Sequence, residues 1–233
     1  MQGDEISGAP PGPRRTARRA LVLAGLSWRA FFEEVEPRDP EWFHSGIAWL
    51  ARDDLRAEAE PDEARLLGAP RGSWTDRDRI NASWGIEAAA VLAWALRLYA
   101  LPAHDAEVDP QHVADALGLF AEAPSALGAS ALRPREELAW MEERLFHLHW
   151  RLRALTVTSG PLDFTRILED GTARSEAAAV AFAGRDLAVG GAPIATAPQE
   201  AVLIAGSIAL ERHHAIAWLV GDTPLWSEVD TST

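Results

Sequence analysis

The chain of 233 residues has no cysteine, no lysine and a single tyrosine. Without cysteine it cannot form a disulfide, a thiolate nucleophile, an iron–sulfur cluster or a cysteine-ligated zinc site. Without lysine it has neither a Schiff-base residue nor a P-loop lysine, and all 22 basic residues are arginines. A glycine-rich phosphate loop and a Gly-x-Ser-x-Gly motif are also missing, so these classes of enzyme are excluded.

Long hydrophobic runs are missing as well. The longest apolar stretch, "IEAAAVLAWALRLYALP", is interrupted by Glu87 and Arg97 and is too short to cross a bilayer. The basic start of "RRTARRALVLAGLSWRAFFEE" leads into an amphipathic pattern without a cleavage-type site, so no secretory signal is expected. Together with the absence of cysteine, this favours a cytoplasmic protein with no membrane partner.

The chain has few positively charged residues. The 35 Asp and Glu residues outnumber the 22 arginines and give a formal net charge of −13. Binding of nucleic acid requires a basic face to neutralise phosphate, so no nucleic-acid partner is expected. An acidic surface is instead complementary to a basic protein partner. The sequence predicts no cofactor and gives no indication of an oligomeric state.

The composition supports one domain with a sizeable core, because 48% of the residues are hydrophobic. Residues 1–13, "MQGDEISGAPPGP", are rich in Gly and Pro and predict a disordered tail. Residues 14–233 are expected to form a single mostly helical domain. Ten tryptophans are present, and their helical spacing from other apolar residues favours core packing over an aromatic binding surface.

Hydrophobic periodicity and capping residues predict an all-α fold with about six to eight helices. The first helix is expected over about residues 14–36. Asp39-Pro40 and Asp109-Pro110 each combine an N-cap with a proline at the first helical position. Thr75 opens a long helix that stops before Pro102.

The C-terminal third is predicted to contain one small β-hairpin and a last helix. The stretch "DLAVGGAPIA", residues 186–195, has the pattern of a hairpin that turns at Gly190-Gly191. Thr196 and Gln199 have the spacing of a capping box, with a proline inside the first turn. The helix that follows is expected to stop at Gly221.

Polar residues stand on helix faces that the periodicity predicts to be buried. Glu87 shares one stripe with Trp84 and Trp94, so it is expected to be a buried carboxylate. Glu143 and His147 are four residues apart on the next long helix and also share a face.

The stretch "ERHHAIAWLVG" concentrates such residues in the last helix. Glu211, His214 and Trp218 lie at spacings of three and four, so they are expected to face the core. Arg212 and His213 are expected toward the flank of the helix.

One interpretation of these residues is a functional carboxylate–histidine site between helices. Glu87, Glu211 and His214 are the candidates for acid–base catalysis, because burial raises the pKa of a carboxyl group. A Glu-x-x-His pair on one helix can also present two ligands to a metal. The four metal-ligand candidates are Glu143, His147, Glu211 and His214, but the Glu-x-x-His spacing occurs only once among them, so no bound metal is expected.

The other interpretation is structural. A buried glutamate must be paired and hydrogen-bonded, and arginines close to the apolar stripes could supply bidentate partners for Glu87 and Glu211. Such pairs would hold the helices in register. The predicted structural polar core comprises Glu87, Arg18, Arg19, Glu211, Arg212, His214 and Trp218.

Four separated pieces of the sequence follow a known pattern. They are "RRTARRALVLAGLSWRAFFE", "WGIEAAAVLAWALRLYALP", "LRPREELAWMEERLFHLHWRLR" and the closing "ERHHAIAWLVGDTPLWSEVDTST". Together they resemble the bacterial domain of unknown function family 4272 (DUF4272) over most of residues 14–233. The chain departs from the family pattern at Ala217, where asparagine is common, and at Ser227, where an aspartate is. The resemblance implies a compact, mostly helical cytosolic domain and implies no activity.

Two functions therefore remain open. The first is a non-enzymatic binding or accessory protein, of which an immunity-type protein that masks a basic toxin surface is one form. The second is a hydrolase or metalloenzyme that uses a buried Glu/His site between helices. The acidity of the chain and the lack of a recognised catalytic motif favour the first.

Overall fold

The computed structural model describes residues 10–157, 162–164, 182–221 and 223–233. Within these ranges it contains eight α-helices, short 3-10 helices and one small antiparallel sheet. The predicted mainly helical fold with a hairpin near residues 186–195 is thus confirmed. Most of the predicted disordered tail lies outside the described residues; α1 begins at Pro13, and Pro11 is already buried.

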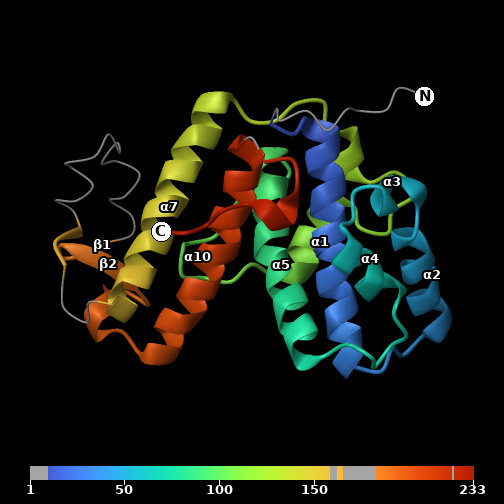
Figure 1. Cartoon of the computed structure of the whole chain (residues 1–233), viewed down its shortest axis with the longest axis horizontal. Coiled ribbons are helices and arrows are strands. Elements are labelled where there is room, and N and C mark those ends of the chain that lie inside the picture. The colour runs from blue at the N-terminus through green and yellow to red at the C-terminus, as the bar shows by residue number, and fades with distance from the viewer. Residues whose placement is uncertain (1–9, 158–161, 165–181, 222) are drawn as a thin grey trace.

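Four long helices lie side by side across the molecule in the order α1, α5, α10 and α7 (Figure 1). Their bounds are α1 Pro13–Glu34, α5 Asp76–Ala95, α10 Gln199–Val220 and α7 Arg135–Val157. Residues 85–95 of α5 are all buried, because α1 covers one side of this helix and α10 the other. A helix segment buried on several sides is apolar all round, as residues 85–95 of α5 are apart from Glu87.

Three shorter helices lie on the α1 side of this layer (Figure 1): α2 Pro40–Leu50, α3 Asp53–Arg56 and α4 Pro61–Gly68. The short helix α6 Pro110–Leu117 contacts both α1 and α5. The helix that starts at Pro40 ends at Leu50, because the chain bends at residues 51–52 and forms α3 as a separate turn.

The predicted helix starts are confirmed where the capping residue acts locally. The Asp39 carboxylate accepts hydrogen bonds from two backbone N–H groups of α2, and Asp109 does the same for α6. Thr75 and Asp78 form a capping box at α5. Thr196 does not cap α10: its hydroxyl donates to the Pro193 carbonyl at 3.0 Å within a 3-10 turn, and the helix starts after Pro198 without a side-chain cap.

The sheet lies beside α7 and has three short strands, β1 Phe182–Ala183, β2 Asp186–Val189 and β3 Ala192–Pro193, in the order β1-β2-β3. Gly190 and Gly191 connect β2 to β3 with φ of 60° and 78°, the left-handed backbone that a two-residue hairpin turn requires. Asp186 ties the sheet to α7, because it accepts two hydrogen bonds of 2.7 Å from Arg151. No helix in the described ranges has the length and apolarity to cross a bilayer.

Candidate functional site

Glu87 and Arg212 form an ion pair in the core between α5 and α10. The Arg212 Nε donates to Glu87 Oε2 at 2.8 Å, and the two side chains are 2% and 1% exposed. The second Glu87 oxygen accepts from the Val108 backbone N–H at 2.8 Å. The remaining Arg212 nitrogens donate to the carbonyls of Ala103 and Ala106 at 3.0 and 2.8 Å. Both side chains are therefore fully engaged, and together they join α5, α10 and the loop at residues 103–108.

The structure places both Arg212 and His213 in the core and not on the flank of α10, where their spacing from Trp218 suggested they would lie. The physical reason is that α5, α7 and the C-terminal segment contact three different sides of α10. No single inward face exists on such a helix, so position relative to one apolar stripe does not identify the buried residues.

Glu211 is half-buried on α10 and has no ion pair or carboxylate hydrogen bond within the described residues. Burial, and next the charge of nearby Glu87, raises the pKa of Glu211 to about 7. The expected arginine partner for Glu211 is thus absent from the described part of the chain, because Arg212 turns to Glu87. Glu211 is the one predicted acid–base candidate whose pKa is shifted toward neutrality there.

His214 and Trp218 both contact the C-terminal segment. The His214 ring stacks on Trp226 with ring centroids 4.5 Å apart, and its Nε2 lies 2.9 Å from the Trp226 carbonyl. Trp218 is fully buried and meets Trp226 edge-on. On the α1 side, the guanidinium of Arg19 lies 5.3 Å from the Trp226 ring centroid. These contacts hold the C-terminal segment against α10 and α1, so His214 has a packing role.

Within the described part of the chain, the two N-terminal arginines of the predicted polar core form no ion pair with Glu87 or Glu211. Arg19 is buried and forms an ion pair with Glu63 of α4. Arg18 is half-buried. A buried pair that the sequence did not indicate, Arg29–Glu33, lies further along α1, where Arg29 also stacks near Trp74 at 5.2 Å.

The metal-ligand candidates of α7 are not brought together with those of α10. The His147 ring bonds along its own helix, with Nδ1 2.7 Å from the Glu143 backbone carbonyl. Among the described residues, no group of three or more His, Asp or Glu side chains is arranged to hold a metal ion.

A histidine pair links α7 to α10 instead, and sequence spacing did not reveal it. His149 Nδ1 and His213 Nδ1 are 3.1 Å apart, and both side chains are buried. Burial lowers the pKa of each to about 4; the charge of Arg153 adds to the effect on His149, and the neighbouring histidines add to that on His213. Both rings are therefore neutral at pH 7, and one N–H donates to the lone pair of the other.

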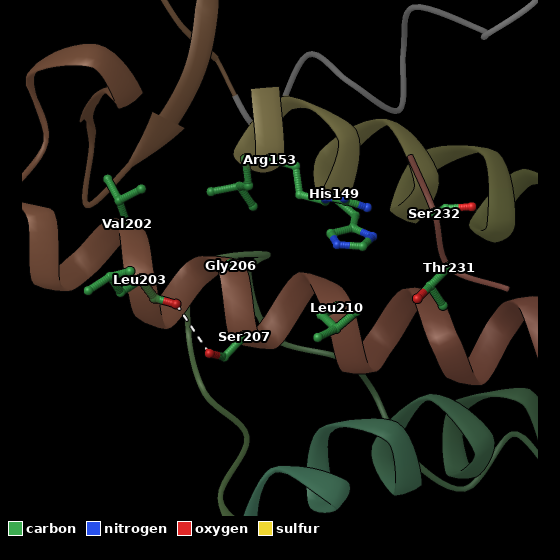
Figure 2. Close-up of a pocket in the computed structure, with 10 residues that line it drawn as sticks. His149, Arg153, Val202, Leu203, Gly206, Ser207, Leu210, Thr231 and Ser232 are labelled. Atoms are coloured by element: carbon green, nitrogen blue, oxygen red, sulfur yellow. Dashed lines mark hydrogen bonds between the residues drawn. The ribbon is translucent and has the colours of Figure 1, made fainter. Parts of the chain in front are cut away.

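A groove of about 540 Å³ opens beside this pair, between α7, α10 and the C-terminal segment (Figure 2). His149 and Arg153 border it from α7, while Leu203 and Leu210 border it from α10 and are 64% and 38% exposed. The full lining comprises His149, Leu152, Arg153, Val202, Leu203, Gly206, Ser207, Leu210, Thr231 and Ser232. None of these described lining residues is acidic.

A second candidate site is an exposed group of aromatic rings at the end of α1 and the start of α2. Phe31 is 59% exposed and Trp42 is 48% exposed, and both contact Phe32, with ring centroids 5.0 and 5.7 Å apart. We refer to Phe31, Phe32 and Trp42 as the aromatic surface. Trp28 and Phe43 stack beneath it with centroids 5.3 Å apart. The sequence predicted that these rings belong to the core. Helical spacing alone does not separate the two possibilities, because it is the same for buried and for exposed rings.

The surroundings of the aromatic surface are acidic. The segment from Phe31 to Trp42 contains five acidic residues and one arginine. Glu34 and Glu36 are 65% and 79% exposed and pair with Arg79 and Arg71 of the same chain. The aromatic surface thus combines exposed rings with carboxylates at its edge.

Comparison with known proteins gives one match. The family model described as Domain of unknown function (DUF4272) matches residues 6–164. No curated protein and no solved structure matches the chain. The matched range contains Glu87, the aromatic surface and the first three sequence pieces on which the resemblance rests; the fourth, residues 211–233, lies beyond it, and its resemblance stays a prediction.

Proposed function

This chain belongs to the family Domain of unknown function (DUF4272), and because that name carries no activity we propose a function from its described surfaces. The protein is a non-enzymatic binding domain that engages a basic protein partner through the aromatic surface. The observation that carries the proposal is the exposure of Phe31 and Trp42, 59% and 48%, on top of a packed aromatic cluster.

Two properties of the aromatic surface support this function. Exposed aromatic rings that rest on a rigid base are the side chains that most often dominate protein interfaces, because they bury a large area at little cost in conformational entropy. The rings also offer faces to the arginine and lysine side chains of a partner, while the exposed Glu41 at the edge attracts the same cations. An immunity-type role, in which the domain masks a basic toxin surface, is one form of this function.

The alternative of a hydrolase or metalloenzyme receives less support. Every polar atom of the Glu87 carboxylate is bonded within the core, and His214 lies against Trp226. Glu211 has a pKa near neutrality, but within the described residues it has no histidine hydrogen-bonded to its carboxylate. The geometry of a nucleophile or metal with its base is therefore not assembled around it.

The proposal can be tested by site-specific photo-crosslinking. A photoreactive phenylalanine analogue is placed at Phe31, or at Leu203 as the control, and the full chain is irradiated in lysate of its own host. Leu203 is similarly exposed but lies on α10, which carries none of the rings of the aromatic surface. A basic protein captured from position 31 and not from position 203 is then purified for binding measurements.

Binding of that purified protein decides the question. We expect the Phe31→Ser, Trp42→Ser variant to weaken it at least about tenfold, and Leu203→Ser to leave it unchanged. Binding should also weaken with added salt, because charge attraction contributes. Equal affinity of the double variant, or capture of an acidic protein, would reject the proposed surface.

A further inference from the structure

We propose that His149 of α7 and His213 of α10 form a two-coordinate binding site for a copper(I) ion. The ion lies between the two Nδ1 atoms and replaces the hydrogen bond between them. This site is separate from the aromatic surface and does not depend on the function proposed for it.

The two rings point their Nδ1 atoms at each other. These atoms are 3.1 Å apart and the ring centroids are 5.3 Å apart, close to the largest separation that two five-membered rings can have at this nitrogen distance. The lone-pair directions of the two nitrogens therefore lie almost on one line. Copper(I) accepts two nitrogen ligands in line, whereas zinc(II) requires about four in a tetrahedron. The pair thus suits copper(I), although no group of three metal ligands is assembled among the described residues.

The ion can enter after a small movement of one ring. Two metal–nitrogen bonds of about 2.0 Å each place the nitrogens of a linear site about 4 Å apart, so the rings must separate by about 1 Å. His149 borders the groove of about 540 Å³ between α7 and α10, and its ring can move toward that open space (Figure 2). His213 contacts the Phe146 ring, with centroids 5.6 Å apart, and stays in place. The same groove gives the ion access from solvent.

The charge around the pair favours a monovalent ion over a divalent one. The structure records no ion pair between a described carboxylate and either ring, and the charges that act on the rings are those of Arg153 and of neighbouring histidines. Asp230, next to the groove, accepts hydrogen bonds from Ser232. The second charge of a divalent ion would therefore be buried without compensation, which is costly.

Binding of the ion leaves both rings neutral. In the hydrogen-bonded pair, one Nδ1 carries the proton and the other accepts it. When copper(I) binds, the donor ring loses this proton from Nδ1 to water and takes one up from water at Nε2. The net reaction joins one copper(I) ion to two neutral imidazoles and releases no proton, so only the charge of the ion is added.

The test is anaerobic competition for copper(I) between the full chain and ferrozine, whose copper(I) complex is coloured. We expect the chain to withdraw one copper(I) ion per molecule. His149→Asn keeps a hydrogen-bonding amide beside His213 but removes one nitrogen ligand, so it should weaken binding at least about tenfold. His112→Gln and His147→Gln change histidines outside the pair and are the matched controls, which should alter binding less than about twofold.

X-ray absorption at the copper edge of the loaded chain checks the geometry, and we expect the spectrum of linear copper(I) with two nitrogen neighbours. Thermal melting without copper shows whether each variant is folded, and His149→Gln replaces His149→Asn if the latter is not. The proposal is overturned if the parent withdraws no copper(I), if a folded His149 variant binds it as tightly as the parent, or if the bound ion has three or four neighbours.

Discussion

Glu87 and Arg212 are two opposite charges with almost no access to water, and each supplies the other's main partner. Removing one of them leaves the other charged and buried, which costs about 3–5 kcal/mol. We expect Glu87→Ala to lower the free energy of unfolding in urea by this amount. In the double variant Glu87→Met, Arg212→Leu, no charge is stranded, so most of the loss should be recovered.

A surface pair provides the control for that cycle. Arg133 and Glu137 pair at 2.8 Å but are 27% and 47% exposed, so Glu137→Ala should cost less than about 1 kcal/mol. If the double core variant were as unstable as the sum of its single variants, the two side chains would not be coupled as the structure indicates.

Glu211 gives a pH-dependent prediction with a definite sign. Its folded-state pKa of about 7 lies above the ordinary 4.5, so between these pH values the unfolded chain is ionised while the folded carboxyl is protonated. Unfolding then releases a proton, and the stability contributed by this group falls as pH rises from about 4.5 to 7. Glu211→Gln should therefore raise stability at pH 8 by about 1–3 kcal/mol and leave it unchanged near pH 4.5. A stability gain independent of pH would contradict the assignment.

The histidine pair gives a pH dependence of stability with the opposite sign. The folded-state pKa of His149 and of His213 is about 4, below the ordinary 6.5, so the unfolded chain takes up protons first as pH falls. Stability is then lost as pH falls from about 6.5 to 4. In denaturation curves across this range we expect His149→Gln, His213→Gln to reduce the loss of stability, and a double variant that loses as much stability as the parent would contradict the assignment.

At the scale of the helices, the Trp28 ring of α1 reaches the backbone of α2 at Gly46 because this residue has no side chain. A Cβ atom there would lie 2.7 Å from the Trp28 ring, which Phe43 holds in place from beneath. We expect Gly46→Ala to lower the free energy of unfolding by about 1–3 kcal/mol, even though alanine favours a helix. Gly206→Ala, where the Cβ has open space, should instead raise it by about 0.5–1 kcal/mol. If both substitutions changed the free energy of unfolding equally, α2 or the Trp28 ring would have moved to make room for the added methyl group.

The start of a helix could be predicted where it depends on residues that are neighbours in the sequence. Asp39, Asp109 and Thr75 cap the helices that follow them because an N-cap needs only the next three residues. Thr196 has the same sequence pattern, but its hydroxyl donates to the Pro193 carbonyl and does not cap α10. The burial of Glu87 was also predictable, since it lies in a helix that is apolar on every side.

The candidate site was far less predictable, because its contacts join distant parts of the chain. The Glu87–Arg212 pair spans 125 residues and the His149–His213 pair spans 64. Residues 211–214 are four adjacent polar residues of one helix. Their spacing does not determine which of them contacts a residue of another helix. The exposure of Phe31 and Trp42 was not predicted for a related reason. An aromatic stripe has the same period whether or not another helix covers it.

On the scale of the whole molecule, the C-terminal segment connects the two halves of the helical layer. Trp226 stacks on His214 of α10, and its ring lies near Arg19 of α1, while the Ser227 N–H donates to Glu60 beside α4. The same segment continues to Thr231 and Ser232, which border the groove beside α7. Holding Trp226 in place thus fixes one end of the groove.

Trp226→Ala should therefore loosen the contact between the two halves of the layer. It removes a half-buried indole from between α10 and α1, so we expect the free energy of unfolding to fall by about 2–4 kcal/mol in urea denaturation. The neighbouring Leu225, 39% exposed, is the control, and Leu225→Ala should change the free energy of unfolding little. A Trp226 variant of unchanged stability would mean that the C-terminal segment is not what joins α10 to α1, and the rings of Trp218 and His214 would then have to be held by α1 and α5 alone.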